Sequence, residues 1–353
     1  DSAVVGQEAE NVMLGWRFAG EKELSTDTLN VLARMMCNGK AGVMELDLEQ
    51  PMKVQAIQTF PYTQTDYSAY IILGLPVAGQ KLEDVKALIL EEIEKMKRGE
   101  FDDDLLPSVK NNMKLEYYKS LLSNQSRADK FVESFVSGRN WDVAVNTIDR
   151  INGITKQQMV DFINRHFTDN YACVYKRQGV DTTLAKIDKP QITPIPANRD
   201  KTSQFLKDIA SSEAKPIQPV FLDLKKDVTV TKTRQGLPVI YKQNTSDGLF
   251  ELMFCYDFGT EDVRGLDLVP QYLYYIGTDK KTSAEINKEF YKLACSYSID
   301  VNDDQMTISL SGLSENMPQD NSIQRMAPAH ITGYLLRIMQ GEEYGKTYDL
   351  NAF

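Results

Sequence analysis

Residues 265–278, GLDLVPQYLYYIGT, have the frame of a helix that holds zinc in a metal hydrolase: a Gly-Leu entry, an apolar turn and a Gly-Thr end. Such a hydrolase needs His-x-x-Glu-His inside that frame. Two imidazoles one turn apart hold the metal, and the carboxylate takes a proton from the metal-bound water. The corresponding residues are Leu268, Gln271 and Tyr272. None of them can do that chemistry, so we expect neither a catalytic residue nor a metal ligand here.

Histidine and cysteine content also disfavours a zinc site elsewhere in the chain. A catalytic zinc site usually uses two or three histidines, and the two histidines present, His166 and His330, are far apart in sequence. Four cysteines are widely spaced, with no Cys-x-x-Cys pair: Cys37, Cys173, Cys255 and Cys295. Each lies in an apolar segment, where we expect a small buried side chain. We therefore predict no cofactor in this chain.

Charge and hydropathy exclude two classes of partner. A formal net charge of −10 disfavours nucleic-acid binding, which needs concentrated Lys and Arg. No apolar run is long enough to span a bilayer. The N-terminus, DSAVVGQEAENVMLGWRF, lacks the basic start and apolar core of a signal peptide. We expect the chain to be a piece of a longer protein.

Residues 1–185 are predicted to form one domain in which strands and helices alternate. The clearest element is an amphipathic helix over 81–98, which Gly99 ends. Thr155 and Gln158 have the form of a capping box and predict a helix through His166. The other predicted elements are strands at 12–18, 52–60, 67–75 and 171–176, a helix from Ser25 to Gly39, and a long helix to about 137 with an interruption near 123–126.

Three local signals in this domain carry more specific expectations. Ser25 is predicted to cap its helix, and Pro61 to mark a turn between two strands. The acidic run 100–104 predicts a solvated helix N-terminus rather than a cation site, because a calcium loop needs spaced ligands and a turn glycine. His166 is predicted to be a capping or surface residue in the last turn of its helix.

Residues 186–220 are predicted to be a linker, because they contain Pro190, Pro194, Pro196, Pro216 and Pro219 around a short helix at 202–210. A second domain, 221–353, is predicted to follow and to be truncated. Its predicted elements are a hairpin at 228–232 and 237–242, strands at 249–258, 297–301 and 306–311, a helix starting at Thr282 or Ser283, and a helix at 330–340. The fold class is thus α+β: two related domains, each a mainly antiparallel sheet packed with helices, joined by a proline-rich linker.

Several segments in this order resemble the pitrilysin/insulinase family of zinc metallopeptidases. In the first domain these are VMLGWRF, ILEEIEKMKRGEFDDDLLPSVKNNM and INGITKQQMVDFINRHF, and in the second TRQGLPVIYKQN, YDFGTEDVRGLDLV, YYIGT and TISLSGLSENM. The resemblance covers about 5–317. It implies that the chain is the second domain, the linker and the start of the third domain of a four-domain clamshell, and that zinc and His-x-x-Glu-His belong to a domain upstream. Active members clamp peptides with an Arg and a Tyr; the nearest residues here are Gln50 and Val54, a departure from that pattern.

Two readings of the resemblance remain open. In the first, the chain is the non-catalytic centre of a zinc metallo-endopeptidase and forms chamber wall and inter-half linker, with a peptide as substrate and the remaining domains as partners. In the second, the whole protein is an inactive homologue that serves as a scaffold or peptide-binding subunit of an active peptidase. Members often bind substrate as an added β-strand, so exposed sheet edges are candidates for that contact. The residues indicate no compartment; family analogy favours a bacterial periplasm or cell envelope.

A reading independent of the family is an aromatic ligand platform at 272–275. Aromatic residues at this spacing are more often part of a core, and we expect that here. Glu261 and Asp262 beside Arg264 are expected to form a solvated turn with a surface ion pair rather than an acid/base site.

Overall fold

The computed structural model describes residues 1–183, 188–197, 199, 201–213, 215–221, 223–233, 236–277 and 281–316. The chain divides into two compact units. The first comprises Asp1–Val180 and the segment that begins at Asn244, and the second comprises Asp181–Gln243. The predicted helix at 330–340 lies outside the described residues. The predicted domain boundaries at 185 and 220 remain predictions.

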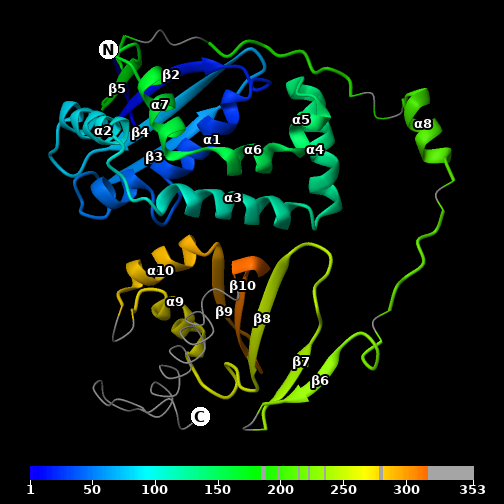
Figure 1. The fold of residues 1–353 in the computed structure, drawn as a ribbon. Coiled ribbons are helices and arrows are strands. Elements are labelled where there is room, and N and C mark those ends of the chain that lie inside the picture. Colours follow the sequence, from blue (N-terminus) through cyan, green and yellow to red (C-terminus); the bar gives the residue numbers. More distant parts are fainter. Residues whose placement is uncertain are drawn as a thin grey trace. The chain divides into compact units, whose positions relative to one another are not determined.

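The N-terminal part of the first unit is built on a five-stranded sheet with the order β1-β5-β2-β4-β3 (Figure 1). The strands are β1 (Ser2–Gly6), β2 (Asn11–Ala19), β3 (Ala56–Tyr62), β4 (Tyr67–Leu75) and β5 (Ala172–Gln178). All neighbouring pairs are antiparallel except β1 and β5, which are parallel. Strand β2 buries every second side chain, as its alternating pattern predicts: Val12, Leu14, Trp16 and Phe18.

Helices complete this core. They are α1 (Ser25–Met36), α2 (Leu82–Lys97), α3 (Leu105–Ser120), α4 (Asn124–Ser137), α5 (Trp141–Val145), α6 (Thr147–Gly153) and α7 (Lys156–His166), with a π-helix η1 (Glu45–Glu49) before β3. Apolar side chains of α1, α2, α3, α6 and α7 join those of the sheet in one buried cluster. Helix α2 matches the predicted 81–98, and Gly99 follows it with φ of 72°. The capping box of Thr155 and Gln158 is also confirmed.

Two local predictions for this domain are wrong. Ser25 is the first residue of α1 rather than its cap, and no side chain caps that helix. Pro61 lies inside β3 rather than in a turn. A proline is tolerated there because β3 is at the edge of the sheet, where a missing N–H removes no ladder hydrogen bond.

A second, three-stranded sheet follows in the same unit. Its strands β8 (Leu249–Tyr256), β9 (Cys295–Val301) and β10 (Met306–Leu313) are antiparallel in the order β8-β10-β9. Helix α10 (Ser283–Lys292) begins at a capping box of Thr282 and Glu285, which confirms the start predicted from the sequence. Side chains of α9 (Val269–Leu273), α10 and the three strands form a separate hydrophobic cluster.

Helix α3 contacts this second sheet region within the first unit. Leu115 is buried together with Leu249, Ala294 and Leu313. The acidic run precedes α3 as predicted, and Asp104 is the residue before its first turn. Its carboxylates are paired as well as solvated: Asp102 lies 2.7 Å from Lys288, Asp104 2.6 Å from Lys292, and Asp103 2.7 Å from Lys156.

The second unit holds helix α8 (Gln204–Ser211) and the antiparallel hairpin β6 (Thr229–Lys232) and β7 (Pro238–Tyr241). The short helix and the hairpin were both predicted. Their side chains are exposed, so neither has a hydrophobic core of its own among the described residues. Within the described part of the chain, no helix is long and apolar enough to cross a membrane.

Candidate functional site

The segment with the zinc-helix frame is folded as two short pieces instead of one continuous helix. Leu268 ends a 3-10 turn, η2 (Leu266–Leu268), and Gln271 and Tyr272 lie in the five-residue helix α9. Pro270 stands in the first turn of α9. Because proline has no N–H, the hydrogen bonds of the preceding turn cannot continue into α9 at that residue. The last residue of the frame, Thr278, lies outside the described residues.

The three motif positions all face solvent. Leu268 is 65% exposed and Tyr272 is 56% exposed, and Gln271 is also exposed. Leucine offers no metal-binding atom, and the neutral amide of Gln271 cannot accept a proton from water at neutral pH. These residues therefore do not fit a catalytic zinc ion. Among the described residues, no group of three or more His, Cys, Asp or Glu side chains is placed to hold a metal.

The tyrosines of this segment have unequal roles. Tyr274 is structural: its ring stacks on Tyr297 at 5.3 Å between centroids, and its hydroxyl accepts a hydrogen bond from the Ile299 N–H at 3.2 Å. Tyr272 and Tyr275 are exposed, by 56% and 84%. The expectation that the aromatic run belongs to a core is therefore wrong for these two side chains, because only one side of this short helix packs on β9.

The two candidate clamp residues differ in their exposure. Val54 is fully buried in the core of the N-terminal sheet. Gln50 directly follows the π-helix η1 and is exposed. A buried valine and an exposed glutamine supply neither the charge nor the ring of an Arg and Tyr clamp.

His166 packs against aromatic rings, and two of the cysteines are poor nucleophiles. Partial burial and the neighbouring Arg165 lower the pKa of His166, whose ring lies 4.5 Å from Phe162 and 5.1 Å from Phe18. Burial raises the pKa of Cys37 to about 12 and that of Cys295 to about 11, which makes both thiols poor nucleophiles at neutral pH. Cys255 is exposed on β8, contrary to the expectation that every cysteine is buried.

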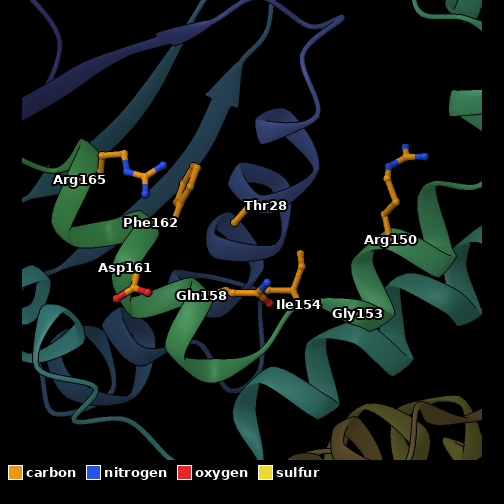
Figure 2. Close-up of a pocket in the computed structure, with 8 residues that line it drawn as sticks. All are labelled: Thr28, Arg150, Gly153, Ile154, Gln158, Asp161, Phe162 and Arg165. Carbon is orange, nitrogen blue, oxygen red and sulfur yellow. The ribbon is translucent and has the colours of Figure 1, made fainter.

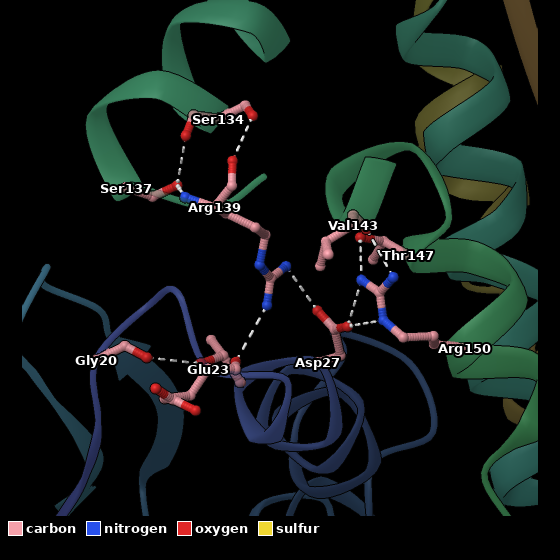
Figure 3. A network of polar contacts seen from close by, with 10 residues as sticks. Gly20, Glu23, Asp27, Ser134, Ser137, Arg139, Val143, Thr147 and Arg150 are labelled. Carbon is pink, nitrogen blue, oxygen red and sulfur yellow. Dashed lines mark hydrogen bonds and ion pairs between the residues drawn. The ribbon is translucent and has the colours of Figure 1, made fainter. Parts of the chain in front are cut away.

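The sequence analysis missed a buried ionic centre at Asp27 (Figure 3). This residue is in the first turn of α1 and is 3% exposed. Its carboxylate accepts from Arg139 at 2.9 Å and from Arg150 at 2.8 Å. Arg139 also donates to the carbonyl of Glu23, and Arg150 to that of Val143. All the partners belong to the protein, so the centre ties the start of α1 to α6 and to the turn after α4 rather than to a ligand.

A pocket of about 430 Å³ lies next to this centre (Figure 2). It is lined by Thr28, Arg150, Gly153, Ile154, Gln158, Asp161, Phe162 and Arg165. Arg150 is committed to Asp27, and the Asp161 carboxylate accepts from Gln157 at 2.9 Å. Arg165 and Arg150 stand on opposite sides of Thr28 in Figure 2. The pocket therefore holds no convergent acid/base pair or nucleophile.

Two of the sheet edges that could receive an extended peptide are blocked at one or two positions. On β3, the outward Ile57 N–H donates to Glu49 at 3.2 Å, and Pro61 has no N–H to offer. On β9, the outward N–H of Ile299 is bonded to Tyr274. Such caps are a common way to prevent a foreign strand from pairing with a sheet edge.

The edge of β8 is open. Because Ser314 N–H donates to the Gly248 carbonyl, the even residues of β8 bond to β10 and the odd residues direct their N–H and C=O away from it. The side chains of Asn244 and Asp247 cap the carbonyl and the N–H of Leu249, the first odd residue. Glu251, Met253 and Cys255 follow, and within the described residues of the first unit no further strand pairs with them.

Comparison with known proteins identifies the fold. Neither a protein-family model nor a curated protein matches the sequence of this chain. Among solved structures, pitrilysin aligns with 98% of this chain and 40% of its own, at a TM-score of 0.50 and 14% sequence identity. A protease from Helicobacter pylori aligns with 50% of this chain and 43% of its own (TM-score 0.48, 19% identity). The inactive domain of an M16 peptidase from Pseudomonas fluorescens aligns with 52% and 44% (TM-score 0.44, 10% identity).

The chain thus has the α+β fold of a pitrilysin-type peptidase, and the resemblance indicated by its sequence motifs is confirmed at the level of fold. Identity of 14% establishes shared architecture and leaves activity to be argued from the residues. The chain spans less than half the length of each of these three proteins.

Proposed function

We propose that this chain is the non-catalytic central part of a zinc-dependent metallo-endopeptidase. One observation carries the proposal: in a pitrilysin-type fold, the segment with the zinc-helix frame forms a 3-10 turn followed by a five-residue helix and presents leucine, glutamine and tyrosine where the ligands and the general base would stand. Catalysis then belongs to a domain upstream that carries His-x-x-Glu-His and the zinc ion.

In this role the chain supplies chamber wall and the linker between two halves. A wall contributes by excluding water and by confining and orienting an extended peptide, and neither task needs a reacting group. The proposed division is a first domain at 1–185, a linker at 186–220 and a second, truncated domain at 221–353. Nearly all described side chains within 181–243 are exposed, which supports the linker assignment because a connector between larger bodies needs no core of its own. A bacterial periplasm or cell envelope is the compartment that such a peptidase favours.

A second candidate is an inactive homologue that binds peptides for an active partner subunit. The edge of β8 supports it, because the N–H and C=O groups of Glu251, Met253 and Cys255 pair with no strand among the described residues of the first unit and can pair with an extended peptide without any catalytic residue.

Zinc content and peptide cleavage of the full-length protein separate the two candidates. The first requires His-x-x-Glu-His upstream, about one zinc per chain, and cleavage that a chelator abolishes. If the upstream domain lacks these ligands and the full-length protein neither holds zinc nor cleaves peptides, the first candidate is wrong and the second remains. The 353-residue chain expressed alone is the control: we expect it to retain no stoichiometric zinc and to cleave no peptide. A metal held at Gln271 would contradict both candidates.

A further inference from the structure

Helix α4 is inverted relative to an ordinary surface helix. Its buried residues are two serines, Ser134 and Ser137, which are 9% and 5% exposed. The face toward solvent carries Phe131, Val132, Phe135 and Val136, and Phe135 is 87% exposed. A helix on the surface of a globular protein normally turns its apolar stripe to the core and its polar residues to water.

Polar contacts join the buried serines of α4 to the turn that follows the helix. Ser134 donates from its hydroxyl to the Arg139 carbonyl at 2.7 Å, and Ser137 donates to the Ser134 carbonyl (Figure 3). The small serine side chains let the helix lie close to the turn at Arg139, whose guanidinium is bonded to Asp27. Gly138 ends the helix in a left-handed conformation with φ of 68°. Arg139 therefore links the end of α4 to the same buried centre that ties α1 to α6.

The exposed face continues onto α5. The Phe131 ring stacks on Trp141 at 4.2 Å between centroids, and Trp141 and Val145 are each 38% exposed. We call this surface the α4–α5 patch: Phe131, Val132, Phe135, Val136, Trp141 and Val145. An aromatic side chain carries about 200 Å² of surface, so Phe131, Phe135 and Trp141, which are 59%, 87% and 38% exposed, together leave roughly 370 Å² open to solvent. A contiguous apolar surface of several hundred Å² on a soluble protein marks an interaction site.

The charges around the patch favour a protein surface as its occupant. Asp129, Glu133 and Asp142 are exposed beside it, together with Arg127. A nucleic acid or an anionic membrane would require basic residues without this acidic share. An apolar centre with a rim of mixed charge is the composition of a packed interface between protein domains.

We propose that the α4–α5 patch is the surface on which the upstream domain of the same polypeptide packs. This inference rests on the proposed function, which places a further domain before this chain. The observation that supports a domain as occupant is the fold comparison: pitrilysin shares this architecture, and the chain covers 40% of it, so the same fold occurs in a much longer protein. The inverted helix then has its apolar face buried in the complete protein.

Hydrogen exchange measured by mass spectrometry on the full-length protein and on the 353-residue chain tests this inference. We expect amides of residues 124–145 to exchange at least tenfold more slowly in the full-length protein. The same amides should exchange at an unchanged rate when the 353-residue chain is diluted, since a second copy is not the occupant. Equal exchange in both proteins, or protection that disappears on dilution of the short chain, would overturn the proposal.

Matched variants of the full-length protein give a second test. Phe135→Asp should raise the exchange rate of 124–145 toward that of the 353-residue chain. Phe221→Asp is the control, because Phe221 is 83% exposed but lies outside the patch. Tryptophan fluorescence checks that both variants fold. Equal exchange in the two variants contradicts the inference. The two failures are distinguishable: an upstream domain that protects the patch but lacks zinc and cleavage defeats the proposed function alone, and a zinc-dependent peptidase in which residues 124–145 stay unprotected defeats this inference alone.

Discussion

Replacing Asp27 by alanine should unfold residues 1–180 at a clearly lower urea concentration. The carboxylate is 4% exposed and accepts from two guanidinium groups, those of Arg139 and Arg150. Its removal leaves both cations close together without their counter-ion, and leaves polar atoms inside the protein without partners. The Nε atom of Arg139 is already buried without a hydrogen bond, so this guanidinium has little capacity to find a new partner.

The size of the effect follows from the burial of the three side chains. Breaking a buried ion pair by removing one partner costs about 3–5 kcal/mol. The two arginine side chains are 13% and 26% exposed, so water reaches part of each and the lower end of that range applies. We expect a loss of about 3 kcal/mol, which at a urea slope of about 2 kcal/mol/M moves the midpoint down by about 1.5 M.

The two tryptophans of the chain, Trp16 and Trp141, both lie in residues 1–180, so fluorescence reports the unfolding of this region. Asp103→Ala is the control: this carboxylate pairs with Lys156 but is 89% exposed, and an exposed pair contributes little. The control should leave the midpoint within about 0.3 M of the unmodified protein. A shift for Asp27→Ala below about 0.5 M, or one equal to that of Asp103→Ala, would refute the assignment of Asp27 as a structural centre.

Three further predictions test burial, packing and the motif. Burial raises the pKa of the Glu92 carboxyl group in the folded protein, and the Lys95 ammonium offsets only part of that effect. The folded protein therefore keeps the full contribution of the protonated carboxyl below the ordinary carboxyl pKa and loses it as the pH rises through the raised pKa. Glu92→Gln should therefore gain stability relative to the unmodified protein from pH 4 to pH 8 in urea titrations, and a constant difference contradicts this. Gly74→Ala places a Cβ 2.7 Å from Val85 and should lower the free energy of unfolding by about 1–3 kcal/mol. Gly153→Ala, with nothing within 4 Å, should not lower it. Zinc analysis after gel filtration should find no retained metal in a variant with all three motif residues restored, L268H, Q271E and Y272H; stoichiometric zinc would show that the break at Pro270 does not matter.

Local signals in the sequence were sufficient for much of the secondary structure. The helix predicted at 81–98 is Leu82–Lys97, and the capping box at Thr155 forms as expected. These elements depend on interactions between side chains three or four residues apart, so a short stretch of sequence is enough to predict them. The prediction at Pro61 failed because proline's effect depends on whether its strand has a neighbour on that side, which a local window does not contain.

Contacts between distant segments were beyond the reach of the sequence pattern. Strand β1 pairs in parallel with β5, although most of the sequence of the first domain lies between the two strands. An alternation of apolar and polar residues indicates a strand, but it does not indicate which strand is its neighbour. Asp27 reads as an ordinary acidic residue in a first helical turn. Only the fold shows that its partners are Arg139 and Arg150, which are 112 and 123 residues further along the chain.

For function, the sequence by itself determined that the chain lacks zinc-binding chemistry at Leu268, Gln271 and Tyr272, because the donor atoms of a side chain are a property of residue type. The tertiary structure decided which surfaces remain available for recognition. It occupied outward N–H groups on the edge strands β3 and β9, left β8 without a further strand partner among the described residues of the first unit, and turned the apolar face of α4 to solvent. Exposure depends on what packs against a residue, and the packing partners are far away in sequence.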